Sequence, residues 1–315
     1  MPAPKMLIDC DPGHDDALAI LYAAQHVDLV GLTTVHGNNT LENTTRNALA
    51  VLELGGLDVP VAVGCAEPLA QPRAASAAVH GDSGLDGADL PQPTRSPTNM
   101  HGVDFLIEMA RQYRGELVVA VIGPQTNIAL ALRREPRLKE WIRELTIMGG
   151  STGRGNITPA AEFNIHCDPE AAWTVFNSGL PIKMVGLNVT RQTGFNDADI
   201  ARLRASGPRA ASVMADLMSF YLARQRERRD TKVAPVHDVC AIVPYVDASL
   251  LEYADGRVNV ELAGTHTRGM TVCHLEADLK NTDPASVAQI NASIAIAARE
   301  RDLVEHLITT VLRYP

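Results

Sequence analysis

The first 190 residues of the chain alternate short aliphatic runs with amphipathic stretches of helical periodicity. This order of elements is typical of a parallel sheet covered by helices, in which right-handed crossovers join successive strands. The sequence therefore predicts an α/β fold with an open, mostly parallel, Rossmann-like sheet. The expected strands are Met6–Ile8, Leu29–Val35, Val59–Val63, Leu117–Ile122, Leu145–Met148 and Ile182–Val185, and the expected helices are Asp16–Gln25, Thr45–Leu54, Val103–Tyr113, Asn127–Arg134 and Glu170–Asn177.

From residue 196 onward the pattern becomes more helical, with helices expected over Ala198–Arg204 and Ala210–Arg228 before a tail of mixed pattern. The 315 residues contain no internal repeat and no low-complexity linker, so we expect residues 1–315 to form a single domain. The segment Cys65–His101 is long, rich in Pro, Gly and Ala, and lacks clear periodicity. Loops of that length are usually functional or mobile.

The helix expected over Ala210–Arg228 carries two side-chain patterns. Its apolar residues have helical spacing, which predicts a face packed in the core: Met214, Leu217, Met218 and Tyr221. It ends in a basic run, for which a solvated helix face is the expected role and an anion site the alternative. The run consists of Arg224, Arg226, Arg228 and Arg229.

Composition excludes several classes of protein. With 37 acidic against 28 basic residues and a net charge of −9, the chain lacks a broad positive surface, so no nucleic-acid partner is expected. No apolar run approaches the ~18 residues that span a bilayer. The N-terminus has no signal-peptide core, so the cytoplasm is the expected location. Five separated cysteines without a Cys-x-x-Cys spacing predict reduced thiols rather than disulfides or a thiolate zinc site.

Four carboxylates follow the first expected strand within eight residues: Asp9, Asp11, Asp15 and Asp16. Such charges on one turn repel one another strongly at low dielectric constant, so the arrangement requires a cation. Because all the ligands are oxygen atoms, a hard divalent ion is favoured, and Ca²⁺ somewhat more than Mg²⁺. Each carboxylate taken alone also has a structural interpretation as a turn residue or a helix cap.

Other polar side chains recur just after the expected strands. In an open parallel sheet the carboxyl ends of the strands share one edge, where ligands bind, so we expect these groups to converge. Asn and Glu side chains in such a crevice suit sugar hydroxyls, which need both donors and acceptors. Singly, each is more often a turn or cap residue. The group comprises Asn38, Asn39, Thr126, Asn127, Glu162, Asn164 and Asn188.

Together with the pair His237-Asp238, these segments resemble the inosine-uridine-preferring nucleoside hydrolase family, whose members hydrolyse the N-glycosidic bond of ribonucleosides. The resemblance runs from about residue 6 to 275 and is greatest to members that prefer pyrimidine ribonucleosides. The most specific match is Asp9–Ala17, which reads DCDPGHDDA. The supporting matches are Gly37-Asn38, Val79–Gly84, Gly123–Asn127, Met148–Gly150, Ala161–Asn164 and Asp168–Ala172.

The resemblance implies a Ca²⁺ cofactor, a nucleoside as the small-molecule substrate, and a homotetramer or homodimer. Its implied Ca²⁺ ligands are Asp11, Asp16, the main-chain carbonyl of Thr126, and Asp238. Its implied ribose contacts are Asp15, Asn38, Glu162 and Asn164, with Asn156 at the 5′-hydroxyl.

Three further roles follow from the resemblance. Asp11 accepts the proton of the attacking water as general base. His237 activates the leaving base, for which a histidine is suited, and His80 supports it from the long loop. We assign no role to the nearby His14 and His36.

Two features depart from the family pattern. No aromatic residue lies between Tyr221 and His237, where similar pyrimidine-preferring enzymes place aromatic side chains against the base. Position 188 is Asn where relatives commonly have Asp, which removes one charge near the expected site.

Two other functions remain as alternatives. A non-catalytic protein that binds nucleosides with Ca²⁺ would keep the fold and lose turnover. A phosphohydrolase of the haloacid dehalogenase type would use Asp9-x-Asp11 as its nucleophile motif and Asp82 within a second motif. The latter is disfavoured because no adequate strand precedes Asp82.

Overall fold

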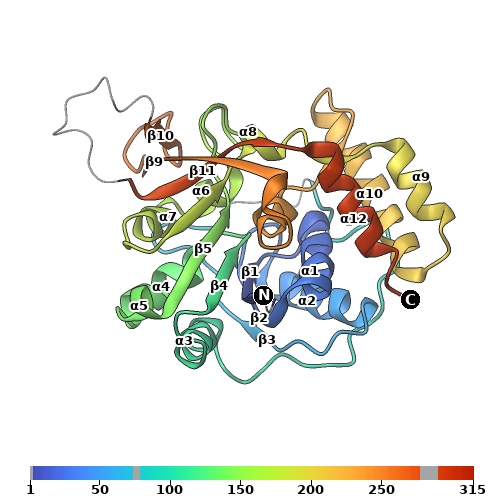
Figure 1. Cartoon of the computed structure of the whole chain (residues 1–315), viewed down its shortest axis with the longest axis horizontal. Helices are drawn as coiled ribbons and strands as arrows, with labels where there is room; N and C mark the ends of the chain where they lie inside the picture. The colour runs from blue at the N-terminus through green and yellow to red at the C-terminus, as the bar shows by residue number, and fades with distance from the viewer. Residues whose placement is uncertain (1–2, 74–78, 277–289) are drawn as a thin grey trace.

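A nine-stranded sheet runs through the computed structural model, which describes residues 3–73, 79–276 and 290–315 (Figure 1). Its strands are β1 (Lys5–Cys10), β2 (Asp28–Thr34), β3 (Val61–Val63), β4 (Leu117–Val121), β5 (Ile142–Met148), β6 (Ile182–Val185), β9 (Leu251–Val260), β10 (Thr271–Leu275) and β11 (Ala292–Ala298). Their order across the sheet is β10-β9-β11-β6-β5-β4-β1-β2-β3.

The pairing confirms the predicted mostly parallel sheet. Neighbouring strands are parallel from β3 across to β11, and β9 is antiparallel to both β11 and β10. The six expected strands all form. The tail of mixed pattern supplies the other three, which the sequence did not reveal because β9 alternates buried and exposed residues irregularly and bears charged side chains.

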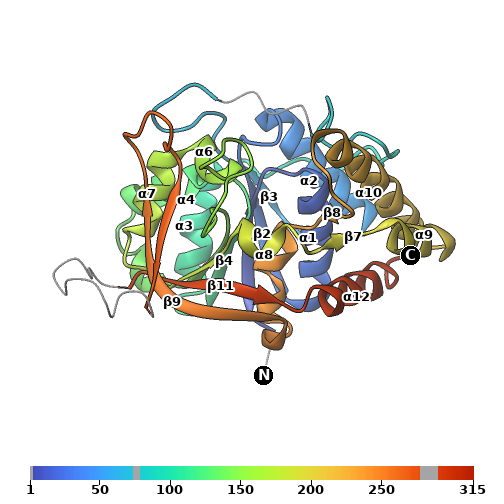
Figure 2. The same ribbon diagram turned by 90° about the horizontal axis from the view of Figure 1, so that it is seen from above.

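Helices cover both faces of this sheet (Figure 2). One face carries α1 (His14–His26), α2 (Leu41–Leu54), α10 (Arg209–Arg228) and α12 (Glu300–Val311). The other carries α3 (Gly102–Gln112), α4 (Thr126–Arg134), α5 (Leu138–Trp141) and α7 (Pro169–Phe176). Shorter or peripheral elements are α6 (Phe163–Cys167), α8 (Leu187–Thr190), α9 (Asp197–Ala205), the hairpin β7 (Gly194–Phe195) and β8 (Ala234–Pro235), and the 3₁₀ turns η1 (Asp238–Ala241), η2 (Val243–Tyr245) and η3 (Ala248–Leu250).

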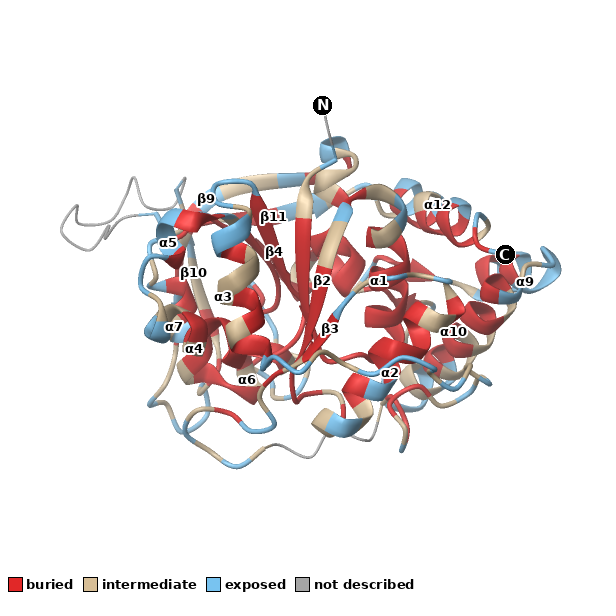
Figure 3. Cartoon of the chain, turned by 90° about the horizontal axis from the view of Figure 1, so that it is seen from below, coloured by how far each residue is buried: buried red, intermediate tan, exposed pale blue. Residues whose placement is uncertain are grey.

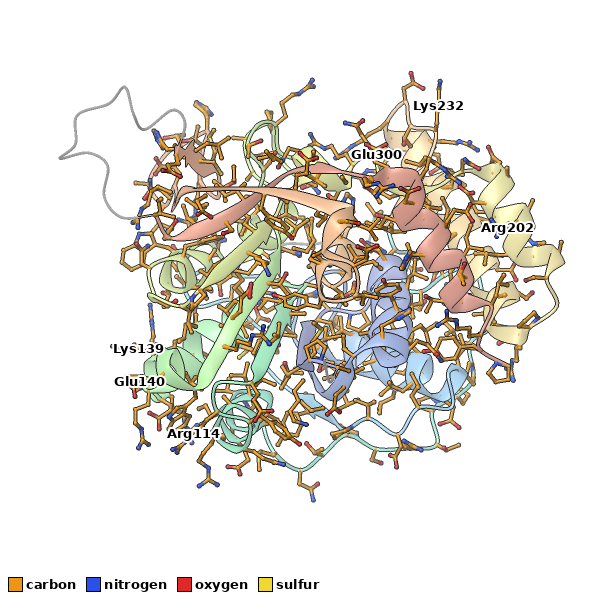
Figure 4. All side chains as sticks on the ribbon, in the orientation of Figure 1. Arg114, Lys139, Glu140, Arg202, Lys232 and Glu300 are labelled. Carbon is orange, nitrogen blue, oxygen red and sulfur yellow. The ribbon has the colours of Figure 1, made fainter. Side chains whose placement is uncertain are left out.

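Two apolar cores result, one on each face of the sheet (Figure 3). The expected core face of α10 is confirmed, because Met214, Leu217, Met218 and Tyr221 are all buried. Charged side chains such as Arg114, Lys139 and Arg202 project from the periphery (Figure 4). Within the described residues, no helix is both long enough and apolar enough to cross a bilayer.

The strand order reverses beside β1, and this reversal positions the site. The chain passes from β1 to β2 and β3 on one side, and β4 then returns to pair with β1 on the other. Loops that follow neighbouring strands diverge at such a switch point and leave a crevice at the carboxyl ends of the strands.

The buried side chain of Asn127, in the first turn of α4, holds the switch point together. Its amide nitrogen donates to Asp9 Oδ1 at 2.8 Å and to the Thr34 carbonyl at 3.0 Å. Its Oδ1 accepts from the main-chain N–H of Cys65 at 2.9 Å. One amide therefore ties together the ends of β1 and β2 and the start of the long loop.

We expect Asn127→Ala to lower the free energy of unfolding by about 2–4 kcal/mol, because it leaves buried partners on three segments without hydrogen bonds. Urea denaturation measures the loss. The exposed amide of Gln112 provides the control, and Gln112→Ala should change stability by less than about 0.5 kcal/mol. A loss below about 1 kcal/mol for Asn127→Ala would contradict this role.

Candidate active site

A cavity opens at the carboxyl ends of the strands, where the sequence placed the site. Its walls come from the start of α1, the loops after β2 and β5, the long loop before α3, the end of α10 and the start of η1. Most of the predicted site residues line it: Asp15, Asn38, His80, Asn156, Glu162, Asn164, His237 and Asp238.

Three buried carboxylates meet on one side of this cavity. Asp15 and Asp16 lie in the first turn of α1, and Asp238 begins η1 more than 200 residues later. Each offers an oxygen within 4.8 Å of the oxygens of the other two. Local sequence accounts for the first pair, because carboxylates at a helix N-terminus are favoured by the helix dipole and the free N–H groups.

Asp11 contacts the same cluster from the end of β1. Its main-chain N–H donates to Asp16 Oδ1 at 3.2 Å, and its Oδ2 accepts from the N–H of Asn38 at 2.6 Å. The Asn38 amide also donates to Asp16 Oδ2 at 3.2 Å, so Asn38 lies between the two carboxylates and the cavity.

The other oxygen of Asp11, Oδ1, is buried and has no hydrogen-bond partner among the described residues. Glycines crowd this carboxylate from both sides. A Cβ at Gly37 would come within 1.9 Å of Oδ2, and one at Gly123 within 2.7 Å of Oδ1. The chain thus brings an orphaned carboxylate oxygen close to three other carboxylates.

Burial has the largest electrostatic effect on the carboxylates of the cluster, and repulsion between like charges adds to it. Burial, followed by the charge of Asp16, raises the pKa of both Asp11 and Asp15. Burial also raises the pKa of Asp16. For Asp238, burial and then the charges of Asp15 and Asp16 raise the pKa well above its usual value. Because buried like charges need a counter-ion and all the donors are oxygen, these residues fit a hard divalent cation.

These shifts make the stability of the metal-free protein depend on pH. A carboxylate whose pKa is raised on folding binds protons more tightly in the folded state, so stability falls as pH rises from about 4 toward the raised values. A bound cation replaces those protons. We therefore expect Ca²⁺ to raise the Tm more at about pH 8 than at about pH 5.5.

Thermal unfolding with Ca²⁺ or with a chelator measures the effect. The double variant Asp16→Asn/Asp238→Asn should lose most of the Ca²⁺ response and be less sensitive to pH in chelator. If Ca²⁺ raised the Tm equally at both pH values, binding of the ion would not depend on deprotonation of the carboxylates, and the cluster would not be its site.

Two of the predicted sugar contacts, Glu162 and Asn164, line the cavity from α6 and the residue before it. Glu162 caps α6, with Oε1 accepting from the N–H of Asn164 at 2.8 Å and Oε2 from that of Gly150 at 2.9 Å. The Asn164 amide donates to the carbonyls of Ile122 at 2.8 Å and Met148 at 3.1 Å, at the ends of β4 and β5. Both side chains are therefore held rigidly against the sheet edge.

Two histidines also line the cavity. The Nδ1 of His237 lies 2.7 Å from the Thr190 hydroxyl, so its Nε2 is the nitrogen left for the cavity. Burial, followed by the charges of Arg191 and Arg229, lowers its pKa to about 3. The Nδ1 of His80 accepts from the main-chain N–H of His14 at 3.2 Å, and burial lowers the pKa of His80 well below its usual value.

His14 is a residue whose contribution the sequence did not reveal. Its Nε2 bonds the carbonyl of Asp86 at 2.9 Å, and its ring stacks on those of His80 and Tyr221. Tyr221 also stacks on His80 and lines the cavity. The only signal in the sequence was the place of His14 within the acidic segment. A lone histidine there does not indicate a partner such as His80, 66 residues away.

Besides Asn127, four sequence-selected side chains are hydrogen-bonded to partners outside the carboxylate cluster. Asp9 accepts from Thr33 at 2.5 Å and from Asn127, so it belongs to the sheet interior. The hydroxyl of Thr126 is engaged by Asp168 at 2.7 Å and by His36 at 3.0 Å. The amide of Asn188 donates to the Ala295 carbonyl at 2.9 Å. Asn39 bonds the carbonyl of Asp82 at 3.1 Å.

Further cavity residues were not selected from the sequence. Apolar and polar side chains from several loops and from α10 complete the wall: Val79, Ile122, Met148, Ile157, Phe163, Tyr221, Gln225, Arg228 and Arg229. Arg226, Arg228 and Arg229 are exposed, as expected for a solvated helix face, but the last two also reach the cavity mouth.

Known proteins are similar to this chain in both sequence and fold. The sequence profile of the inosine-uridine preferring nucleoside hydrolases matches residues 6–297. The pyrimidine-specific ribonucleoside hydrolase RihA of Escherichia coli O1:K1 is 42% identical over 271 residues, which cover 85% of this chain and 87% of that protein. A plant nucleoside hydrolase, PpNRh1, superposes with a TM-score of 0.91 at 32% identity, with 99% of each chain covered. A purine-preferring ribonucleoside hydrolase from Gardnerella vaginalis gives 0.90 at 31% identity, with 98% of each chain covered.

The chain is therefore a nucleoside hydrolase, an enzyme that hydrolyses N-glycosyl compounds. It belongs to the inosine-uridine preferring nucleoside hydrolase family, as the sequence predicted, and the match extends through β11 rather than ending near residue 275. Asp82 lies in a loop, and residues 79–81, which the structure describes just before it, form no strand to carry the second motif of the haloacid dehalogenase alternative.

Proposed function

We propose that this protein is a Ca²⁺-dependent hydrolase of pyrimidine ribonucleosides, uridine and cytidine, which it converts to free base and ribose. One observation carries the proposal. Two carboxylates of the buried cluster, Asp15 and Asp238, line the same cavity as the polar groups suited to ribose and the two histidines. The similarity to RihA supports pyrimidine nucleosides as the substrate.

Asp11, Asp16 and Asp238, together with the main-chain carbonyl of Thr126, would hold the Ca²⁺. When bound, the ion supplies Lewis-acid chemistry, because it binds sugar hydroxyls and lowers the pKa of bound water. Asp11 acts as the general base. Because its Oδ2 is held by the N–H of Asn38, Oδ1 is the atom that accepts the proton from the attacking water.

The remaining polar residues bind and orient the ribose. Asp15 and Asn38 face it from the cluster side, and Glu162 and Asn164 from α6 and the residue before it. Departure of the base leaves positive charge on the sugar, as in other glycoside hydrolyses. Fixed carboxylates and amides stabilise that charge more than they stabilise the neutral ground state.

His237 and His80 act on the leaving base. Because burial keeps both imidazoles neutral near pH 7, each donates a hydrogen bond through one N–H and carries no net charge. The main-chain N–H of His14 donates to Nδ1 of His80, so Nε2 of His80 bears the proton. We propose that the Thr190 hydroxyl likewise donates to Nδ1 of His237, which places the proton of that ring on Nε2.

We propose that Tyr221 and Ile157 contact the base. Tyr221 is the aromatic side chain that α10 contributes, and Ile157 from the loop after β5 adds an apolar contact. This wall takes the place of the aromatic residues missing between Tyr221 and His237.

The proposal is tested by measuring free base released from uridine, cytidine, inosine and adenosine, each with and without Ca²⁺. Faster cleavage of the purine nucleosides than of uridine would overturn the pyrimidine assignment.

Asp11→Asn should lower kcat for uridine at least ~100-fold, because the amide cannot accept the proton from water. Stopped ribose assays measure the loss. Asp28→Asn is the control, since Asp28 lies at the far end of β2 and pairs with Lys5 on the surface. A near-normal kcat for Asp11→Asn would remove Asp11 from the proton transfer.

His237→Ala should reduce uridine hydrolysis by ~100-fold or more but leave p-nitrophenyl riboside nearly unaffected, because that leaving group needs no proton. Thr190→Val should show a smaller loss with the same substrate pattern, since Thr190 fixes the orientation of the ring. Steady-state kcat/KM on both substrates is the measurement. Equal losses on the two substrates would assign His237 to the sugar side.

The second candidate function is Ca²⁺-dependent nucleoside binding without turnover. The altered base wall is the observation that favours it, because fewer aromatic contacts orient the base. Calorimetric binding of uridine with no ribose released over many hours would select this function.

A further inference from the structure

Two arginines from separate elements converge on one short loop at the cavity mouth. Arg191 directly follows α8, and Arg229 directly follows α10, the helix that ends in the basic run. The loop is residues 152–161, after β5, and it runs beside α8 (Figure 1). Arg191 donates to the carbonyl of Gly155, and Arg229 donates to that of Asn156 at 2.5 Å.

The same loop closes on itself through main-chain hydrogen bonds. Gly155 N–H donates to the Pro159 carbonyl and Asn156 N–H to the Ala161 carbonyl, each at 3.0 Å. The carbonyls of Gly155 and Asn156 accept from the two guanidinium groups instead. The loop is therefore anchored by its own turn on one side and by the arginines on the other.

This anchoring fixes the side chains that the loop presents to the cavity. Asn156 and Ile157 both line it. The Oδ1 of Asn156 is buried and has no hydrogen-bond partner among the described residues. A buried amide oxygen without a partner costs free energy, so the site is built to receive a donor at that atom.

The charges of the two arginines indicate that contacts with the loop determine their position. Arg191 and Arg229 are close enough that, after burial, the charge of Arg229 contributes most to lowering the pKa of Arg191. Two like charges are brought together only if other contacts offset the repulsion. By contrast, Arg226 in the same basic run pairs with Asp197 on the surface, and Lys232 points away from the protein (Figure 4).

We propose that Arg191 and Arg229 are positioning residues that hold Asn156 over the 5′ end of the ribose and thereby set the preference for a 5′-hydroxyl. This inference rests on the proposed function and on the 5′-hydroxyl contact that the family resemblance implies for Asn156. Arg191 does not line the cavity, and Arg229 lies at its mouth with its guanidinium on the Asn156 carbonyl. They fix the main chain at residues 155 and 156, so that Asn156 Oδ1 accepts the hydrogen bond of the 5′-hydroxyl.

The test compares uridine with 5′-deoxyuridine, which lacks only that hydroxyl. The wild-type enzyme should prefer uridine by ~5–10-fold in kcat/KM, because that ratio corresponds to the free energy of about one hydrogen bond. In Arg191→Ala and Arg229→Ala the preference should fall to within ~2-fold, with the loss confined to uridine. Asn156→Ala should abolish it as well, and combining Asn156→Ala with Arg229→Ala should change the ratio no further.

Arg226→Ala is the matched control, because it removes a basic residue of the same run whose partner is the exposed Asp197, and the substrate ratio should stay at the wild-type value. Arg191→Lys should keep part of the preference, since one ammonium can still donate to one carbonyl. Arg191→Lys also tests the inference if Arg191→Ala does not fold.

A second measurement does not depend on activity. The loop contains the exposed Arg154, so native-state trypsin cleavage after this residue reports how firmly the loop is held. Cleavage should accelerate at least ~5-fold in the Arg191 and Arg229 alanine variants and remain unchanged in Arg226→Ala.

Several outcomes overturn the inference while the proposed function stands. One is wild-type enzyme that cleaves both substrates equally well, and another is an equal loss on both substrates in the variants. Faster hydrolysis of uridine 5′-monophosphate than of uridine, reversed by Arg191→Ala, would make the pair a phosphate site instead. If the wild-type enzyme releases no base from either nucleoside, the proposed function fails and the inference fails with it.

Discussion

The burial of mutually repelling carboxylates at the switch point of the sheet is the constraint on which the rest of this protein depends. Asp11, Asp15, Asp16 and Asp238 come from the end of β1, the start of α1 and the start of η1. Burial raises the pKa of Asp11, Asp15 and Asp238, and the charges of their neighbours raise it further. The fold offsets part of this cost with the N–H groups at the α1 terminus and with Asn38, and the remainder is the free energy available for binding a cation.

Around that cluster the cavity separates two kinds of chemistry. Glu162 and Asn164, fixed to the ends of β4 and β5, face the cluster from a wall rich in oxygen and amide groups. His80 and His237 form a wall of neutral imidazoles whose Nδ1 atoms are already engaged. In the proposed reaction, one set of residues stabilises the charge on the sugar and another donates to the leaving base. Each set is held rigidly by the sheet edge or by a buried partner.

Helix α10 connects the core to the site. Its buried face packs on α1, its Tyr221 stacks against His80, and its end delivers Arg229 to the loop that carries Asn156. One continuous helix therefore supports the protein interior, the base wall and the cavity mouth. The same basic run was interpretable from the sequence as a solvated face, and Arg226 behaves so, but Arg229 turns toward a main-chain carbonyl.

The sequence by itself determined the parallel sheet, its helices and about half of the residues that line the cavity, because apolar periodicity and the polar residues after each strand are local signals. It could not reveal that Asp9 turns into the sheet toward Asn127, or that His14 pairs with His80. It also missed the strands β9–β11, whose mixed pattern becomes a sheet edge only through pairing. Tertiary structure alone decided these features, because side-chain partners far apart in the chain are chosen by packing, and no local spacing records them.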